Sequence, residues 1–335
     1  MTEGMIGFGR GLALVALALV SACQPAARPA PTDEGSSVAR ARTPPVEGLP
    51  QPLRRRQATI RFEDQAGRPF PYPIVDARVR GVPTRLVVDT GASHTVLDVW
   101  LLEQLGVQLV ESEQPGEGHA GEKVATMRAH APHLELEEWG AVPDDVLAVR
   151  LPPVFRTLGL GGVVSPQGLA GPGMVVILDL PASSLRSVPR DEGKKLGDSE
   201  SLGAARPCRV GGDLGGVVYL VDGTVRGHPV RLVVDSGAAR TDVLAQSAAG
   251  RLLREDAASG DTSYTVGGPV RGERVDDETL TVGRLARTLD LGLISGRPSG
   301  ACPRDGHLGM DVLAGCLLVL APDHFGARCP LAATP

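Results

Sequence analysis

The chain has 335 residues, with 34 Lys and Arg against 39 Asp and Glu, which gives a formal net charge of −5. This length allows two domains with a core in each, and 42% hydrophobic against 22% charged residues predicts a mostly globular chain. The mild acidic excess, with no basic cluster beyond residues 54–56, excludes nucleic acid as a partner.

The first segment has the features of an export signal. Arg10 precedes an apolar run at residues 11–20, which is too short to cross the roughly 30 Å hydrocarbon layer as a permanent helix. The small residues directly before Cys23 resemble the lipobox of bacterial lipoproteins, in which the cysteine is acylated and becomes the mature N-terminus. We therefore expect a lipoprotein signal peptide at residues 1–22, with an ordinary secretion signal as the alternative. Gln24 favours the outer membrane, so the anchored protein is expected to face the periplasm or the cell surface.

Two polar segments divide the rest of the chain. Residues 23–57 contain seven prolines and little apolar periodicity, so we expect a disordered tether. Residues 186–207 are poor in apolar side chains and are expected to link two lobes, at residues 58–185 and 208–330. Only 3% of the residues are aromatic, whereas 43 are glycine and 28 proline, which favours short strands and many turns within the lobes.

The two halves repeat one another. Residues 79–95 (VRGVPTRLVVDTGASHT) align with residues 225–241 (VRGHPVRLVVDSGAART) at an offset of 146, with twelve of seventeen positions identical. A second match follows in each half, LGLGGVVS around Gly161 and HLGMDVL around Gly309. Apolar runs that are typical of buried strands come next, at residues 175–178 and 317–320. One supersecondary unit is therefore present twice.

Asp89 and Asp235 occupy matching positions, each at the end of an apolar run where a carboxylate is costly to bury. One such aspartate is equally explained as a turn residue that binds backbone amides. Two copies related by a pseudo-two-fold axis predict a facing pair that shares one proton, because like charges in contact cannot both ionise easily. One carboxyl would then act as a general base and the other as a general acid.

The sequences DTGA at residues 89–92 and DSGA at residues 235–238 resemble the D-[TS]-G-A motif of retropepsin-like aspartic proteases. The Leu-Gly pairs that end at Gly161 and Gly309 resemble the hydrophobic-hydrophobic-Gly motif of that family. The resemblance covers both halves. It implies a mostly β, bilobal acid-protease fold, with two pseudo-symmetric closed β-barrel lobes and short helices around a central cleft. We expect the short helices at residues 97–105 and 311–314.

The resemblance also assigns roles to the motif residues. Asp89 and Asp235 would activate a water molecule to hydrolyse a peptide bond and would protonate the departing amine. The hydroxyls of the next residues would reach the opposite lobe, and the glycines would permit close approach of the backbone. The supporting residues are Thr90, Gly91, Ser236, Gly237, Gly161 and Gly309, the last two beneath the aspartate loops.

Two glycine-rich segments, residues 115–127 and 262–273, lie between the motifs of each half and are candidates for a flap over the site. Tyr264 in the second segment invites comparison with the flap tyrosine of pepsins. We favour the interpretation that this tyrosine lies in an ordinary surface hairpin rather than in a flap.

Four cysteines remain beyond Cys23, and an exported protein meets an oxidising compartment, so we expect two disulfides with three possible pairings. We expect Cys208 to pair with Cys329, at the ends of the second lobe, and Cys302 with Cys316. A buried thiol at Cys316 is the alternative.

No spacing of cysteines and histidines suits zinc, so we expect neither a metal nor another cofactor. The seven histidines are scattered along the chain. His119, His130 and His133 are therefore expected at the surface.

The leading hypothesis is a monomeric, membrane-anchored aspartic endopeptidase that acts on peptides or proteins, with activity favoured below neutral pH because the shared proton must stay bound. A non-catalytic lipoprotein that binds peptides or envelope partners is the alternative. Ser93 and Ala239 support this alternative, since viral retropepsins place an acidic residue at that position. A structural envelope protein, in which each aspartate only caps a turn, is the third hypothesis.

Overall fold

The computed structural model describes residues 55–65, 68–69, 71–112, 115–143, 145–197, 201–210 and 215–331. The predicted signal peptide, Cys23 and nearly all of the predicted tether lie outside these residues. Gln57, the last residue assigned to the tether, already belongs to a strand. Within the described part, no helix combines the length and the apolar character that crossing a membrane requires.

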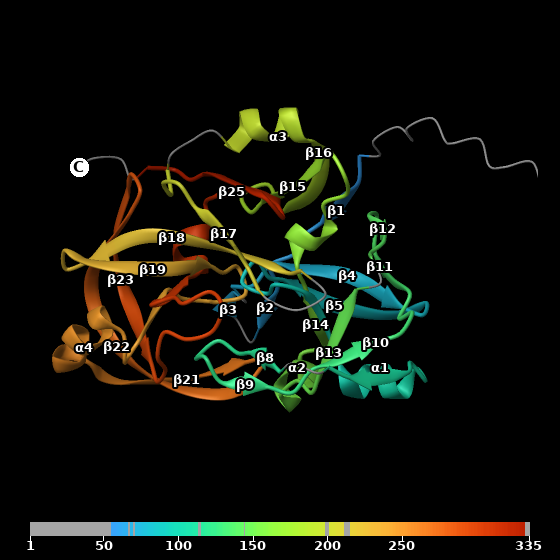
Figure 1. Ribbon diagram of the computed structural model, residues 1–335, viewed down its shortest axis with the longest axis horizontal. Coiled ribbons are helices and arrows are strands. Elements are labelled where there is room, and N and C mark those ends of the chain that lie inside the picture. Colours follow the sequence, from blue (N-terminus) through green and yellow to red (C-terminus); the bar gives the residue numbers. More distant parts are fainter. Residues whose placement is uncertain are drawn as a thin grey trace, which may run out of the picture. The chain divides into compact units, whose positions relative to one another are not determined.

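The first lobe is built on a nine-stranded sheet (Figure 1). Its strands, in spatial order, are β12 (Gly140–Ala141), β11 (Leu134–Leu136), β4 (Ile74–Val79), β5 (Val82–Val88), β14 (Leu160–Val164), β6 (Thr95–Asp98), β13 (Val146–Val149), β10 (Met127–Ala129) and β7 (Leu109–Glu111). The same half of the chain also forms two small hairpins, β2 (Asp64–Gln65) with β3 (Arg68–Pro69) and β8 (Gly116–Glu117) with β9 (Lys123–Val124). Its helices are α1 (Val99–Gln104), α2 (Pro153–Thr157) and the 3₁₀ helix η1 (Pro166–Leu169).

The second lobe is built on an eight-stranded sheet, which an additional pairing of β18 with β22 closes upon itself. Its strands, in spatial order, are β17 (Arg206–Arg209), β18 (Val217–Val225), β19 (His228–Val234), β24 (Gly306–Leu308), β20 (Asp242–Leu244), β23 (Leu285–Ile294), β22 (Gly268–Val282) and β21 (Ala258–Thr265). Its helices are α4 (Ala248–Leu253), the 3₁₀ helix η2 (Arg254–Asp256) and α5 (Met310–Leu313).

A third sheet joins the lobes, because it takes strands from both. Its order is β1 (Gln57–Thr59), β16 (Ser184–Pro189), β15 (Met174–Asp179), β25 (Leu317–Ala321) and β26 (His324–Arg328). The apolar runs predicted at residues 175–178 and 317–320 form β15 and β25, which pair with each other. This mostly β, two-lobed architecture confirms the predicted fold class.

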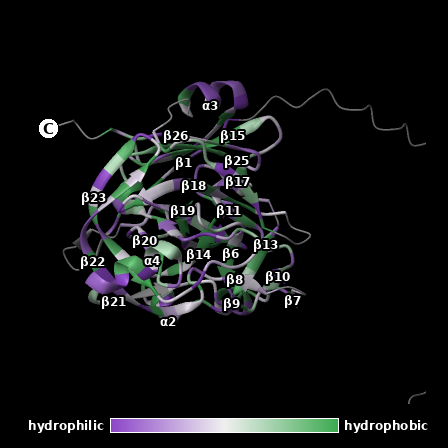
Figure 2. Cartoon of the chain, turned by 60° about the vertical axis from the view of Figure 1, so that its left-hand side comes forward, coloured by the Kyte–Doolittle hydropathy of each residue, from purple (hydrophilic) through white to green (hydrophobic). Residues whose placement is uncertain are grey.

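Local sequence explains the elements that carry the site. Residues 86–88 and 232–234 are apolar and buried, so β5 and β19 run through the core up to each aspartate. Asp98 caps α1 by accepting the backbone N–H of Trp100, which places the helix start at Val99, within the predicted range. Figure 2 shows hydrophobic residues concentrated along the strands of the interior.

The segment predicted as a linker, residues 186–207, is largely regular structure. It contains most of β16, the helix α3 (Arg190–Gly197) and the start of β17. Gly193 and Gly197 let the polar helix approach the third sheet, where a Cβ on Gly197 would lie 2.8 Å from Val319. The two glycines, four residues apart, bury one face of α3 without large apolar side chains, which is why composition alone suggested a linker.

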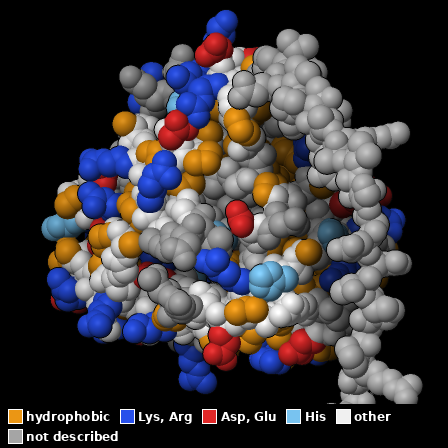
Figure 3. Space-filling model, turned by 45° about the vertical axis from the view of Figure 1, so that its right-hand side comes forward, with side chains coloured by type: hydrophobic (Ala, Val, Ile, Leu, Met, Phe, Trp, Pro, Cys, Tyr) orange, Lys and Arg blue, Asp and Glu red, His pale blue; other side chains and the backbone are white. Residues whose placement is uncertain are grey.

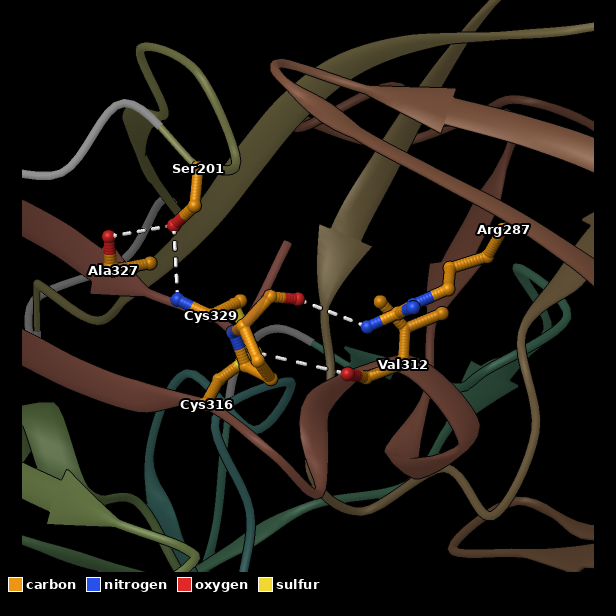
Figure 4. Close-up of a disulfide and its surroundings, with 7 residues drawn as sticks. Ser201, Arg287, Val312, Cys316, Ala327 and Cys329 are labelled. Carbon is orange, nitrogen blue, oxygen red and sulfur yellow. Dashed lines mark hydrogen bonds between the residues drawn. A yellow bond between two sulfur atoms is a disulfide. The ribbon is translucent and has the colours of Figure 1, made fainter. Parts of the chain in front are cut away.

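The predicted disulfide pairing is wrong. Cys208 is bonded to Cys302, and Cys316 to Cys329 (Figure 4). The second bond follows from a local hairpin, because β25 and β26 pair Leu317 with Arg328 and so bring the two flanking cysteines together. Ser201 supports this bond by accepting the N–H of Cys329.

The surface is mixed in charge. Figure 3 shows one face on which acidic, basic and hydrophobic side chains are interspersed. The large hydrophobic residues exposed in the described chain are far apart in the sequence; they are Phe62, Val82, Val110, Leu252 and Leu331.

Candidate active site

The first aspartate loop follows β5. The backbone N–H of Asp89 donates to the carbonyl of Val164 on the parallel strand β14, at 2.9 Å. One carboxyl oxygen, Oδ1, accepts the N–H groups of Gly91 at 2.8 Å and Ala92 at 3.0 Å. The turn therefore fixes one oxygen of the carboxyl group and directs the other away from its own backbone.

The second loop repeats this arrangement after β19. The N–H of Asp235 donates to the carbonyl of Leu308 on β24, at 3.0 Å, and Oδ1 of Asp235 accepts the N–H of Gly237 at 2.8 Å. Asp235 is buried, with 5% of its surface exposed, whereas Asp89 is partly exposed.

The structure brings the two aspartates together, although they are 146 residues apart. A Cβ on Gly91 would lie 2.5 Å from Cγ of Asp235, and a Cβ on Gly237 would lie 2.5 Å from Cγ of Asp89. This reciprocal contact explains both glycines, since any side chain at either position would displace the opposite carboxyl group. The two carboxyl groups form a facing pair across the pseudo-two-fold axis.

Thr90 and Ser236 lock the loops to each other. The hydroxyl of Thr90 donates to the carbonyl of Val234 at 2.7 Å and accepts the N–H of Ser236 at 3.0 Å. The hydroxyl of Ser236 makes the mirror set, donating to Val88 at 2.7 Å and accepting the N–H of Thr90 at 3.1 Å. Both residues are fully buried, so the four bonds hold the aspartates in register without help from solvent.

A histidine from the first lobe also reaches this pair. The hairpin β8–β9 places His119 with Nδ1 3.6 Å from Oδ2 of Asp235 and Nε2 2.6 Å from Oδ2 of Asp242. The ring stacks on His307, with centroids 3.6 Å apart. The expectation that His119 is a surface residue is therefore wrong, whereas His130 and His133 are exposed.

These surroundings separate the pKa values of the two carboxyl groups. Burial and the negative charge of Asp235 hold the pKa of Asp89 well above its usual range. Burial by itself would also raise the pKa of Asp235, but the contact with His119 and the positive charge of that ring bring it below its usual range. Between the two pKa values Asp89 carries a proton and Asp235 is ionised, so the pair can accept one proton and donate another.

Comparison with known proteins identifies this arrangement. The aspartyl protease family matches residues 75–167 and 221–312, together more than half of the chain, and each match contains one of the aspartates. The chain belongs to the aspartyl protease family. The predicted relationship to aspartic proteases is thus confirmed at the level of the family, while no curated protein matches the chain.

Solved structures with low identity are also similar to this aspartyl protease family member. One is an aspartic proteinase from Irpex lacteus, 11% identical, with a TM-score of 0.41 over 82% of this chain and 97% of that one. Another is basic 7S globulin from soybean, 9% identical, with a TM-score of 0.40 over 83% of this chain and 95% of that one.

The supporting role predicted for Gly161 is wrong, because its match to Gly309 is out of register. Val164 pairs with Val88 just as Leu308 pairs with Val234, so the residue equivalent to Gly309 is Ser165. Gly161 lies four residues before Ser165, beside residues 85 and 86 of β5, and so away from the aspartate loop. A Cβ on Gly161 would instead meet Thr84 and Leu101.

Ser165 and Gly309 share one contact. The N–H of Ser165 donates to Oγ1 of Thr95 at 3.3 Å, and that of Gly309 to Oγ1 of Thr241 at 3.1 Å. The late motif of the first lobe is therefore Val-Val-Ser rather than hydrophobic-hydrophobic-Gly.

Two further residues of the site were not predicted. The side-chain amide of Gln167, two residues after Ser165, donates to the carbonyls of Ala92 at 2.8 Å and Val217 at 2.9 Å, so it ties the first aspartate loop to the second lobe. Tyr72 lies in the field of the pair, since burial and the charges of Asp235 and Asp89 raise the pKa of its hydroxyl.

Among the described residues, one set of possible metal ligands coincides with the site. His119, Asp235 and His307 each offer an atom within 4.8 Å of the others. However, Nδ1 of His307 lies 2.9 Å from Asp242 and Nε2 accepts the Nε–H of Arg304 at 3.0 Å. Both ring nitrogens of His307 are thus occupied, and the set fits a hydrogen-bonded network rather than a metal centre.

Proposed function

We propose that this aspartyl protease family member is an aspartic endopeptidase that hydrolyses peptide bonds of peptides or proteins. The observation that supports it most is the reciprocal contact of Asp89 and Asp235 across Gly91 and Gly237, each aspartate held by its own loop. Two carboxyl groups in contact, one protonated and one ionised, are what acid–base hydrolysis of an amide requires.

The residues suggest how the steps are divided. Asp235, which is ionised, takes a proton from a water molecule held between the carboxyl groups, and the oxygen of that water attacks the scissile carbonyl carbon. Asp89, which is protonated, donates its proton to the carbonyl oxygen. Collapse of the tetrahedral species breaks the C–N bond, and the proton that Asp235 took is passed to the departing amine. As the C=O bond of the acid product re-forms, one hydroxyl proton returns to Asp89, so both aspartates regain their starting states. Thr90 and Ser236 contribute by keeping both carboxyl groups in place.

Replacement of either aspartate tests the proposal. Asp89→Asn and Asp235→Asn should each lower kcat for cleavage of a diverse peptide library by about 10²–10⁴-fold or more, since each removes one half of the proton transfer. Asp191→Asn, at an exposed position on α3, is the matched control and should cleave like the wild type. Wild-type cleavage by either active-site variant, with its circular dichroism spectrum unchanged, would refute the peptidase.

The pH dependence follows from the two shifts. Activity should fall at low pH, as Asp235 gains a proton, and again at higher pH, as Asp89 loses the proton that its raised pKa retains. A pH–rate profile that keeps rising into the alkaline range would contradict this division of roles.

We further propose that the enzyme works as a monomer, because one chain supplies both aspartates, and that it is anchored by lipid on Cys23 in the bacterial envelope. The lipobox-like residues before Cys23 support the anchor. Labelled palmitate should be incorporated into the wild type and not into Cys23→Ser, which should move from the membrane to the soluble fraction. Equal labelling of both would contradict the anchor, and a dimer mass in sedimentation would contradict the monomer.

A further inference from the structure

The two lobes differ at one buried pair of residues beneath the aspartate loops. In the first lobe, Val96 on β6 pairs with Val163 on β14. At the equivalent register of the second lobe, Asp242 on β20 pairs with His307 on β24. Asp242 is 6% exposed and His307 3%, so an ionisable pair is buried where the repeat has two valines. Such a pair is costly unless other groups compensate it.

The compensation comes from the hairpin of the other lobe. Oδ1 of Asp242 lies 2.9 Å from Nδ1 of His307, and Oδ2 lies 2.6 Å from Nε2 of His119. The two imidazole rings are stacked at 17° between their planes. The carboxylate thus orients His119 through one ring nitrogen and leaves the other, Nδ1, directed at Asp235.

A second cation fixes the hairpin in this place. The guanidinium of Arg304, which precedes β24, donates to Glu117 at 2.7 Å and to the carbonyl of Gly118 at 2.8 Å. Its Nε–H donates to His307. Arg304 therefore binds the residues immediately before His119 and the ring on which His119 stacks, and its side chain is 11% exposed.

The result is an asymmetric pair of aspartates. Asp235 has an imidazole 3.6 Å from its outer oxygen, whereas the described contacts of Asp89 are the amides of Gly91 and Ala92 and the facing carboxyl group. A positive charge at this distance favours the ionised form of the nearer carboxyl group.

We infer that His119 is a positioning residue of the peptidase: the first-lobe hairpin delivers its positive charge to Asp235, which keeps Asp235 ionised and assigns the shared proton to Asp89. This inference rests on the proposed function. It explains why a Val–Val pair in one lobe corresponds to an Asp–His pair in the other, because Asp242 and His307 are the receiving site for His119.

The charged groups that face His119 agree with this role. They are Asp235 after β19, Asp242 on β20, His307 on β24, Arg304 before it and Glu117 on β8. Burial alone would lower the pKa of His119, but the charges of Asp242 and Asp235 outweigh it and raise that pKa to about 10. Burial and the charge of His119 lower the pKa of His307, so His119 is the ring that carries the proton at neutral pH.

The pH–rate profile of His119→Asn tests the inference. Removal of the cation raises the pKa of Asp235, so the acid limb of kcat/KM, which reports the free enzyme, should move upward by about one to three pH units. His130→Asn, at an exposed position after β10, is the matched control and should reproduce the wild-type profile. An acid limb that stays in place would overturn the inference. So would a higher kcat/KM with both limbs unmoved, since the hairpin would then only obstruct the site.

A second variant copies the first lobe. Asp242→Val with His307→Val restores the valine pair and removes the support of His119, so its acid limb should shift in the same direction as that of His119→Asn. A wild-type limb in this double variant would show that Asp242 and His307 do not orient His119, contrary to the inference.

A readout that needs no activity separates this inference from the peptidase itself. The ring of His119, followed by NMR in the full-length protein, should titrate well above 6.5 and move downward in Asp235→Asn. A ring that titrates near its ordinary value of about 6.5 would overturn the inference. Failure of the peptidase would appear differently, as cleavage that persists in Asp89→Asn or Asp235→Asn.

Discussion

The two lobes start from one repeat and differ in what lies beneath the aspartate loops. The first lobe has Val96 against Val163, which needs only packing, and the second has Asp242 against His307, which needs partners. The partners include His119, delivered by the first lobe. Each half still supplies one aspartate, but the second half also receives the hairpin of the first. Two copies of one unit have thus become complementary rather than interchangeable.

The disulfides mark a second difference, and they lead to the largest expected effect. The first lobe contains no cysteine, whereas the second has one bond between cysteines 94 residues apart and another between cysteines 13 residues apart. Cys208→Ala with Cys302→Ala should lower the free energy of unfolding by about 4–5 kcal/mol, and Cys316→Ala with Cys329→Ala by about 3 kcal/mol, because the longer loop gains more entropy when unfolded.

Chemical denaturation gives the size of each loss, and hydrogen exchange locates it. For the longer loop, amides of the second lobe should lose protection first, while those of the first lobe keep it. For the shorter loop, the first amides to lose protection should be those of β25 and β26 in the shared sheet. An equal loss of amide protection in both lobes would show that the disulfides do not stabilise the second lobe in particular. A larger loss of unfolding free energy for the shorter loop would contradict the entropic explanation.

A smaller effect is expected where the lobes carry Ser165 and Gly309 at equivalent positions. A Cβ on Gly309 would lie 2.8 Å from the backbone nitrogen of Thr241 and closer still to the carbonyl of Arg240, so Gly309→Ser should destabilise the protein by about 1–3 kcal/mol. The hydroxyl of Ser165 has no hydrogen-bond partner among the described residues, so Ser165→Gly should cost only about 0.5–1 kcal/mol.

Thermal unfolding of both variants measures the difference. If Gly309→Ser lowered the stability as little as Ser165→Gly, the backbone around Gly309 would have to shift to accommodate the side chain. Packing would then not require a glycine at this position.

The sequence was enough to predict the features that depend on short motifs or on the repeat. The apolar run before Asp89, the glycine after it and the second copy at Asp235 together imply a facing pair, and the fold class follows from the same repeat. Helix α1 was predictable in the same way, because its cap, Asp98, lies directly before it.

The features that failed depend on strand register or on distant contacts. The letters Leu-Gly occur in both late motifs, but the pairing of Val164 with Val88 makes Ser165, four residues after Gly161, the equivalent of Gly309. The disulfides depend on which strands meet. Helix α3, inside the predicted linker, was not anticipated, because its contact with the third sheet depends on two glycines.

His119 gave a partial signal, since its segment was predicted as a flap. Its partners could not be predicted, because Asp242 and His307 become neighbours only when β20 pairs with β24. Once the repeats are aligned by strand register, an Asp and a His at the positions of two valines would have indicated the site.

The central claim is that Asp89 and Asp235 share one proton, and titration of the Asp89 carboxyl group tests it most directly. In protein labelled with ¹³C at the aspartate side chains, Asp89 should titrate well above its ordinary range, and its pKa should fall in Asp235→Asn, where the neighbouring negative charge is lost. The same titration curve for Asp89 in the wild type and in Asp235→Asn would contradict the claim.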